Sequence, residues 1–357
     1  MRFTAVDCFS GAGGLSLGLQ NAGFEILLSF DNDVKCIETQ KSNAKYFNHP
    51  AVAIGIEDIL DGELLRRLIL ERGELFLLAG GPPCQGFSIQ RIGEDEDIRN
   101  ELVMKYIQLI KEIYPQYFIM ENVPGINGKR GKKILDAALK EAAGMGYWIH
   151  KKLIDAKDFQ VPQRRKRIII VGERMDGQMP LFHFPVPTSN KIVTVREIIG
   201  SLPPPPDDGS DHPDIVHHRK DKLSAINKRR LNALKEGQGR DYLPDELLAN
   251  AHKISSSVIG HRNVYGRMEW DKVAPTITAR FDSFTRGQFG HPEQVRSITL
   301  REGALLQTFP MDFVFCGSKV DIARQIGNAV PPKMGEILGR QIIVSYQDKL
   351  KMSLLGG

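Results

Sequence analysis

Short apolar runs alternate with helical segments through the first 172 residues. The runs lie at residues 4–6, 26–30, 52–54, 75–79, 117–120 and 168–171. Continuous apolar runs of this length are typical of buried parallel strands. Between them, residues 102–113 carry apolar side chains at helical spacing, and a second helical segment, 134–143, stops at Gly144. The pattern therefore predicts a doubly wound α/β sheet.

Polar residues, or a cysteine, mark the carboxyl ends of most of these predicted strands. They are Asp7, Asp31, Asp58, Cys84 and Glu121. In doubly wound sheets, ligands bind outside the carboxyl ends of the strands, near the point where the strand order reverses. We therefore expect the functional site at this edge of the sheet.

The pattern changes after the last predicted strand. Prolines become frequent, above all at 203–206, and they interrupt regular structure. A helical pattern returns at 335–346. The sequence therefore predicts a larger α/β domain at residues 1–184, a smaller domain at 185–312, and a return of the chain to the larger domain at 313–357.

Composition narrows the class of protein. The chain has 357 residues, of which 41% are hydrophobic and 25% charged, as in an ordinary globular protein. Mean hydropathy is −0.25, and because no apolar run approaches the roughly 18 residues of a membrane span, we expect no membrane association. The four cysteines show no CxxC spacing, which argues against bound metal and disulfides. These features predict a reducing, cytoplasmic location.

Charge adds a weaker indication. The formal net charge is +5, and residues 215–240 hold eight basic and two acidic side chains. A local excess of this kind suits a polyanionic partner such as nucleic acid. It equally suits a solvated helix face, so the charge alone leaves both interpretations open.

A glycine-rich turn at residues 7–14 separates the first predicted strand from the first helix. Gly11 and Gly13 form G-x-G, but Ser16 stands where a dinucleotide fingerprint has its third glycine. Asp31 follows Gly11 by 20 residues, a spacing at which an acid binds ribose hydroxyls. The motif predicts an adenosine-containing cofactor, either a dinucleotide or S-adenosylmethionine. A tight turn beside a core aspartate is the alternative.

A second turn, residues 80–88, reads Gly-Gly-Pro-Pro-Cys-Gln-Gly-Phe-Ser. Cys84 directly follows the prolines after a strand, in a position suited to a presented nucleophile. The alternative is a buried, inert thiol, which is the usual fate of a lone cysteine. We assign that inert role to the other three cysteines, Cys8, Cys36 and Cys316.

Two further segments carry candidate chemistry. Glu121 follows a predicted strand and is a candidate acid or hydrogen-bond partner for a base, although acids at strand ends often cap helices. Residues 163–167 read Gln-Arg-Arg-Lys-Arg and enter a strand. Under two-residue alternation, Gln163, Arg165 and Arg167 share one face. The alternative is an exposed basic edge.

Seven motifs in a fixed order give the chain a family resemblance. They are Asp-x-Phe-x-Gly-x-Gly-Gly at 7–14, Gly-Pro-Pro-Cys-Gln-Gly-Phe-Ser at 81–88, Glu-Asn-Val at 121–123, Gln-x-Arg-x-Arg at 163–167, Arg-Ser-Ile-Thr-Leu-Arg-Glu at 296–302, Gln-Thr-Phe-Pro at 307–310 and Gln-Ile-Gly-Asn-Ala-Val-Pro-Pro at 325–332. The ordered set resembles DNA (cytosine-5) methyltransferases of prokaryotic restriction-modification systems, and it spans about residues 3–342. The resemblance implies a Rossmann-like S-adenosylmethionine-dependent methyltransferase sheet with a smaller target-recognition domain.

The resemblance implies a covalent mechanism. Cys84 would add to carbon-6 of a cytosine flipped out of the duplex, which makes carbon-5 nucleophilic toward the methyl group. Glu121 would hydrogen-bond to ring nitrogen-3 and the exocyclic amine. Arg165 would hold the base, with Gln163 and Arg167 as ordering neighbours.

The resemblance also implies S-adenosylmethionine as cofactor and S-adenosylhomocysteine as product. Phe9 would pack on adenine, Asp31 would bind ribose, and Asp58 with Ile59 would border the adenine. Further cofactor-lining positions by resemblance are Gly11, Gly13, Gly14, Pro83, Leu102 and Asn328.

The predicted partner is double-stranded DNA bound at a specific sequence. Candidate DNA contacts are Gln85, Ser88, Arg262, Arg267, Arg280 and Arg286. The resemblance implies that a restriction endonuclease acts on the same site, and DNA binding would associate the enzyme with the nucleoid in the cytoplasm. The single-chain length and the two-domain organisation predict a monomer. The sequence does not reveal which DNA sequence is recognised.

The sequence differs from the family pattern at two places, and several other functions remain alternatives. Cys8 stands where the family commonly has leucine, and residues 55–59 read Gly-Ile-Glu-Asp-Ile where Gly-Asp-Ile is usual. A tRNA cytosine-5 methyltransferase of the same fold is one alternative. The others are a nicotinamide-dependent oxidoreductase, a catalytically inactive DNA-binding relative, and an amino-methyltransferase, which would carry an aromatic residue where this chain has Cys84.

Overall fold

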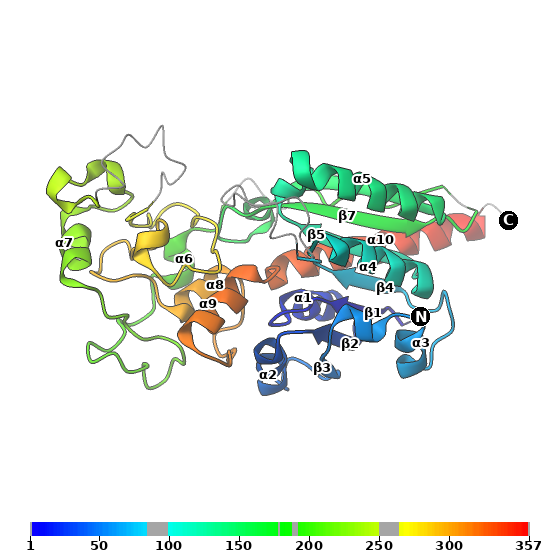
Figure 1. The fold of residues 1–357 in the computed structure, drawn as a ribbon, viewed down its shortest axis with the longest axis horizontal. Coiled ribbons are helices and arrows are strands. Elements are labelled where there is room, and N and C mark those ends of the chain that lie inside the picture. Colours follow the sequence, from blue (N-terminus) through cyan, green and yellow to red (C-terminus); the bar gives the residue numbers. More distant parts are fainter. Residues whose placement is uncertain (1, 84–98, 178, 188–191, 250–263, 356–357) are drawn as a thin grey trace. The chain divides into compact units, whose positions relative to one another are not determined.

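A computed structural model describes residues 2–83, 99–177, 179–187, 192–249 and 264–355 (Figure 1). Cys84, Gln85, Ser88 and Arg262 lie outside the described residues. Within the ranges given, no helix is both long and apolar enough to span a bilayer.

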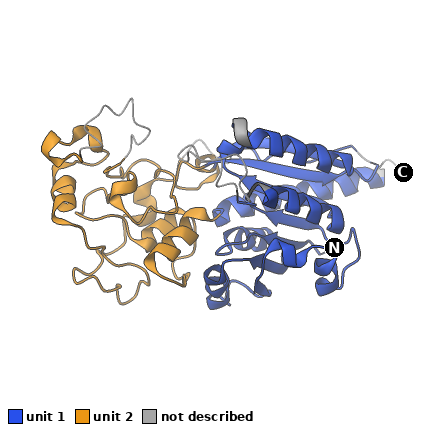
Figure 2. Cartoon of the chain, in the orientation of Figure 1, with its two compact units in different colours: residues 1–155, 166–187, 330–357 blue, residues 156–165, 188–329 orange. Residues whose placement is uncertain are grey.

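The chain divides into two compact units (Figure 2). Unit 1 comprises residues 1–155, 166–187 and 330–357, and unit 2 comprises residues 156–165 and 188–329. These units are defined by packing and not by function. The predicted functional domains, with boundaries after positions 184 and 312, therefore stay a prediction.

Unit 1 is built on a seven-stranded sheet in the order β3-β2-β1-β4-β5-β7-β6. The strands are β1 (Thr4–Cys8), β2 (Glu25–Asp31), β3 (Ala51–Ala53), β4 (Leu77–Gly80), β5 (Tyr117–Asn122), β6 (Tyr147–Asp155) and β7 (Lys166–Arg174). The first five strands pair in parallel, whereas β7 runs antiparallel to both β5 and β6. The predicted α/β sheet is thus confirmed.

Two details of the sheet differ from the prediction. The apolar run at 168–171 lies in β7, which is antiparallel and not parallel as expected. Strand β6 was not predicted, because its Trp148, Lys151 and Lys152 are exposed and no continuous apolar run marks it. A short connection of residues 156–165 joins β6 to β7, and such a connection allows only an antiparallel pair.

Helices cover the sheet of unit 1. They are α1 (Gly14–Ala22), α2 (Val34–Ser42), α3 (Glu63–Leu68), α4 (Arg99–Ile113), α5 (Lys129–Gly144) and α10 (Pro332–Leu355). The helices predicted at 102–113 and 134–143 are α4 and α5, and they pack on the sheet face that carries Val6, Leu78 and Met120. Helices α1 and α10 approach so closely that a Cβ at Gly18 would lie 2.3 Å from the Pro332 carbonyl oxygen.

Short helices and loops build unit 2. Its helices are α6 (Val195–Ile199), α7 (Ala225–Ala233), α8 (Leu300–Leu306) and α9 (Lys319–Asn328). Part of the basic segment 215–240 is internal: the Arg230 guanidinium lies 4.4 Å from the Tyr265 ring centroid and donates to the Leu247 carbonyl. Arg240 is also buried. The local charge is therefore partly structural and only partly a solvated face.

Candidate functional site

The glycine-rich turn between β1 and α1 has an open outer side. Phe9, Gly11 and Gly13 all adopt positive φ angles, of 55°, 53° and 83°. A Cβ at Gly13 would lie 2.6 Å from the Phe47 ring, so this position requires glycine. A Cβ at Gly11 would meet no atom within 4 Å among the residues that the structure describes. Space for a ligand therefore lies over Gly11, beside the N-terminus of α1 at Gly14.

Asp31 holds this turn at the end of β2. Its Oδ2 accepts a hydrogen bond from the Gly11 amide at 2.9 Å, and its Oδ1 accepts one from the Asp33 amide at 2.8 Å. The carboxylate therefore shapes the turn and lies beside Gly11, where the sequence spacing predicts the acid that binds ribose.

A buried polar network supports the turn from below, and sequence reasoning missed it. Gln40, on α2, is fully buried. Its Nε2 donates to Ser10 Oγ at 2.9 Å and to the Gly11 carbonyl at 2.8 Å, while its Oε1 accepts from Ser29 Oγ at 2.7 Å. Gln40 lies in α2, a helix that was not singled out from the sequence, so no sequence signal marked it.

Asp7 lies within β1 and not at its end, so it does not line the turn. Its carboxyl group is 1% exposed, and its Oδ2 accepts a hydrogen bond from Ser16 Oγ at 2.6 Å. Burial raises the pKa of Asp7 to about 7, although the Ser16 hydrogen bonds oppose the shift. Strand β1 thus holds a buried acid behind the turn, and its pKa lies near neutral pH.

This titration makes a stability prediction. Between about pH 4 and pH 7 the folded protein keeps a proton on Asp7 that the unfolded chain has released, so the free energy of unfolding should fall as pH rises through this window. The loss should be on the order of 4 kcal/mol and complete above pH 8. Urea denaturation at pH 5 and pH 8 measures it. About 3 kcal/mol of this loss falls between pH 5 and pH 8. In Asp7→Asn the difference in unfolding free energy between the two pH values should shrink by that part, and an unchanged difference would contradict the assignment.

The other predicted cofactor residues lie in varied surroundings. Asp58 is exposed in a 3₁₀ turn, η1 (Ile56–Ile59), and accepts a hydrogen bond from the Gly55 amide at 2.9 Å. Ile59 is fully buried in the core. Leu102 and Pro83 are half-buried in unit 1, and Asn328 is exposed at the end of α9 in unit 2.

A carboxylate and a guanidinium meet at the end of β5. Arg167 Nε lies 2.7 Å from Glu121 Oε1, and the two side chains are only 16% and 14% exposed. A Cβ at Gly81 would lie 3.2 Å from Glu121 Oε2, so the turn after β4 passes directly beside this carboxylate. The Asn122 amide donates to the Pro82 carbonyl at 3.0 Å and fixes the same turn.

Arg165 and Gln163 do not share a strand face with Arg167, so that prediction is wrong. Strand β7 begins only at Lys166, and both residues precede it in unit 2. Arg165 is 1% exposed, and its guanidinium donates to backbone carbonyls. The acceptors are Ile277, Gly327 and Ala329, at 2.8 to 3.1 Å. The Gln163 amide donates to Leu306 and Gln307 and accepts from the Ile277 amide.

Comparison with known proteins assigns the chain to a family. The model of the C-5 cytosine-specific DNA methylases matches residues 3–344. The chain belongs to this family. Its relatives include the type II methylase M.HgiDII of Herpetosiphon aurantiacus, 34% identical over 94% of both chains. A second is the type II methyltransferase M1.HphI of Haemophilus parahaemolyticus, 33% identical over 96% of this chain and 87% of its own.

A solved structure also resembles this methylase along its whole length. It is described as a DNA modification methyltransferase encoded within a prophage of E. coli, and it covers 97% of this chain and 100% of its own. The identity is 26% and the TM-score 0.70. Members of the family use S-adenosylmethionine, which excludes the nicotinamide-dependent alternative.

Several of the family motifs stabilise unit 2 through ion pairs and hydrogen bonds. Arg296 and Glu302 form a nearly buried ion pair at 2.7 Å, and Glu302 also accepts from the Thr299 amide at the start of α8. Gln307 accepts a hydrogen bond from Gln163, and the Gly327 carbonyl near the end of α9 accepts one from Arg165. Motifs that are far apart in the sequence thus close one hydrogen-bond network around the segment at 274–278.

The described candidates for DNA contact separate into two groups. Arg267 is 4% exposed, and its guanidinium donates to the carbonyls of Leu231, Leu234, His291 and Gln294. This burial gives Arg267 a structural role and contradicts its assignment to DNA. In contrast, Arg280 and Arg286 reach the surface, Arg280 in an ion pair with Asp282 at 3.1 Å.

Proposed function

We propose that this methylase transfers a methyl group from S-adenosylmethionine to carbon-5 of a cytosine within a specific double-stranded DNA sequence. We further propose that it is the modification partner of a restriction endonuclease that acts on the same sequence. The family assignment supports the reaction, and the two type II relatives support the restriction-modification context.

One observation carries the covalent form of the mechanism. The Glu121–Arg167 pair lies beside Gly81, and Cys84 follows Gly81 by three residues of a proline-containing turn. Three residues span at most about 11 Å of chain. A thiol nucleophile and a paired carboxylate are therefore tethered to the same end of the sheet, which is the combination that attack on an electron-poor ring requires.

The chain's own residues then have the following roles. The Cys84 thiolate adds to carbon-6 of a flipped-out cytosine, and the electrons of the 5,6 double bond make carbon-5 nucleophilic. Glu121 hydrogen-bonds to nitrogen-3 and the exocyclic amine, held in place by Arg167. When bound, S-adenosylmethionine supplies an electrophilic methyl group. Loss of the carbon-5 proton restores the double bond, breaks the carbon–sulfur bond and releases the Cys84 thiolate.

The structure changes which arginine we assign to the base. Arg165, the first candidate, donates to three backbone carbonyls and supports unit 2. Arg167 contacts Glu121 directly, so we assign charge stabilisation at the base to Arg167 and a positioning role to Arg165 and Gln163.

The residues around the glycine-rich turn fit the cofactor. We propose that Phe9 packs on adenine, that Asp31 binds the ribose, and that Gly11, Gly13 and Gly14 admit the ligand. Asp58, Ile59, Pro83, Leu102 and Asn328 complete the proposed set. The open side of Gly11 supports the proposal, because a turn that merely packed in a core would be covered.

The experiment that tests this function measures transfer of labelled methyl groups to unmethylated genomic DNA and to tRNA in parallel. Bisulfite sequencing of the modified DNA then identifies the recognition sequence. We expect label in DNA at one defined sequence. Label in tRNA alone would move the protein to an RNA substrate. Label in neither, with S-adenosylmethionine still bound, would identify an inactive DNA-binding relative.

A further inference from the structure

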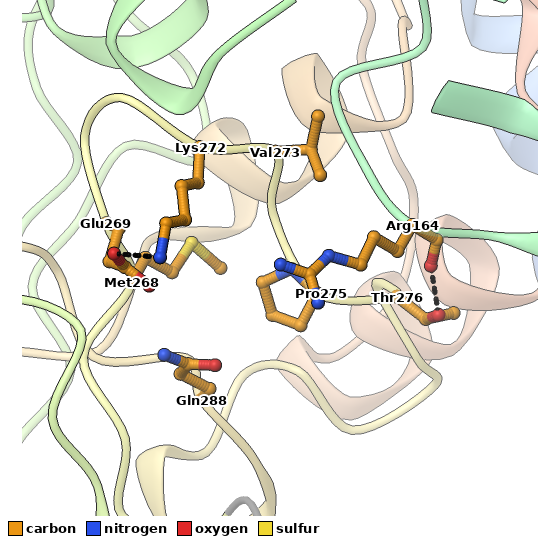
Figure 3. Close-up of a pocket in the computed structure, with 8 residues that line it drawn as sticks. All are labelled: Arg164, Met268, Glu269, Lys272, Val273, Pro275, Thr276 and Gln288. Atoms are coloured by element: carbon orange, nitrogen blue, oxygen red, sulfur yellow. Dashed lines mark hydrogen bonds and ion pairs between the residues drawn. The ribbon is translucent and has the colours of Figure 1, made fainter. Parts of the chain in front are cut away.

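A pocket in unit 2 gathers polar groups that the proposed mechanism does not use (Figure 3). Its polar members are Arg164, Glu269, Lys272 and Gln288, and Val273 and Pro275 contribute apolar wall. None of these residues is among the DNA contacts expected from the sequence. All of them belong to unit 2, so the pocket is defined within one compact body.

Arg164 enters this pocket from a fixed backbone. Its amide donates to the Ala274 carbonyl at 2.9 Å, and its carbonyl accepts from the Thr276 hydroxyl. Its neighbours Gln163 and Arg165 are buried and hydrogen-bonded. The Arg164 side chain is exposed, and its guanidinium has no hydrogen-bond or ion-pair partner among the described residues. Because the backbone is already fixed, only the side chain itself has to be ordered when Arg164 binds an external acceptor.

Two oxygen acceptors stand in the pocket with Arg164. The Gln288 Nε2 donates to the Arg267 carbonyl at 2.8 Å, which fixes the amide and leaves Oε1 on the pocket side (Figure 3). The Glu269 carboxylate holds Lys272 Nζ at 2.7 Å. These side chains do not suit a phosphate, because a phosphate needs donors on all sides and is repelled by a carboxylate.

The edge of a base pair matches this mixture of donors and acceptors. In the major groove, guanine offers O6 and N7 as acceptors, which arginine binds with two N–H groups, and the paired cytosine offers its N4 amine as a donor. The Arg164 guanidinium would take the guanine acceptors, and the oxygens of Glu269 or Gln288 would accept from the cytosine amine.

We propose that Arg164 reads a guanine of the recognition sequence, with Glu269 and Gln288 as the acceptor side of the same contact. This inference rests on the proposed function and deepens it by naming a specificity-determining residue. Arg164 precedes Arg167 by three residues, which span at most about 11 Å of chain. With base pairs about 3.4 Å apart, the guanine should lie within a few base pairs of the target cytosine.

The experiment compares Arg164→Met with Arg164→Lys and with a matched control, Arg229→Met. Arg229 is an exposed arginine on α7 of the same unit, so the control removes the same charge elsewhere. Once bisulfite sequencing of DNA methylated by the wild type has given the recognition sequence, duplexes with one base pair changed at each position are made. Methyl transfer and duplex binding are measured for each duplex with each protein.

For the wild type, changing one recognised base pair should weaken duplex binding by roughly 10- to 100-fold, and this loss is the penalty at that position. In Arg164→Met the penalty should vanish at one G·C position and persist at the others, whereas Arg229→Met should keep every penalty. Arg164→Lys should restore charge but only part of the discrimination, because it lacks the two-pronged geometry.

Two results would overturn the proposal. The first is that Arg164→Met binds all duplexes more weakly by the same factor, and that its affinity depends less on salt by about the amount expected for one phosphate contact. This result would assign Arg164 to the DNA backbone. Unchanged penalties in Arg164→Met would remove Arg164 from recognition altogether. Either result, obtained while the wild type still methylates one defined DNA sequence, leaves the proposed function standing. A wild type that modifies no DNA would instead refute the function on which the inference rests.

Discussion

Cys84→Ser should lower the rate of methyl transfer by at least about 10⁴-fold while leaving S-adenosylmethionine binding intact. The reason is chemical. A serine hydroxyl is far less acidic than a thiol, so it supplies almost no anion to attack carbon-6 at neutral pH. The measurement is a single-turnover assay on a duplex that carries the recognition sequence, with cofactor binding followed separately by calorimetry.

The covalent step can also be trapped. A duplex with 5-fluorocytosine at the target position has no carbon-5 proton to lose, so the thiolate cannot be released after methyl transfer. The wild type and the control Cys316→Ser should form a complex that survives denaturing electrophoresis, and Cys84→Ser should form none. Retained activity in Cys84→Ser, or no stable complex with the wild type, would contradict covalent catalysis by this cysteine.

The sequence predicted the parallel part of the sheet because buried strands carry a strong signal. Strands such as β4 and β5 are covered on both faces, so their residues form continuous apolar runs. Strand β6 lies at the edge of the sheet and exposes Lys151 and Lys152, which leaves no run to detect. The direction of β7 depends on its partners β5 and β6, and a local pattern holds no information about partners.

In the candidate site, too, features with a local sequence signal were predictable and features that depend on distant partners were not. Gly11 and Asp31 could be singled out from the sequence because both follow strands at a familiar spacing, and the structure shows a hydrogen bond between them. Gln40 could not be singled out, because its contacts come from segments far apart in the sequence. The burial of Arg267 was equally hidden, since an arginine that binds carbonyls and one that binds DNA look alike in sequence.

The roles of Arg165 and Arg167 show where alternation fails. Alternation places residues on one face only within a strand, and β7 starts at Lys166, between the two arginines. One side chain therefore meets a carboxylate, and the other meets carbonyls of unit 2. The two arginines should consequently fail in different ways when replaced.

Arg167→Gln should lower kcat by about 10²- to 10³-fold with little change in the free energy of unfolding, because Arg167 acts on a charged group at the reacting base. Arg165→Gln should instead lower the free energy of unfolding by about 3 kcal/mol, since it leaves buried carbonyls without donors. Single-turnover kinetics and urea denaturation of both variants separate the two effects. The reverse assignment, kinetics lost in Arg165→Gln and stability lost in Arg167→Gln, would restore the first interpretation of this motif.

A double variant tests whether Arg167 works through Glu121. If the two side chains act as one unit, Glu121→Gln combined with Arg167→Gln should be little slower than Glu121→Gln alone, because the second replacement removes an interaction that is already lost. If the double variant instead lost rate by the product of the two single losses, the two residues would contribute independently. The 2.7 Å contact between the two side chains favours the coupled result, because replacements of residues in direct contact are commonly not additive.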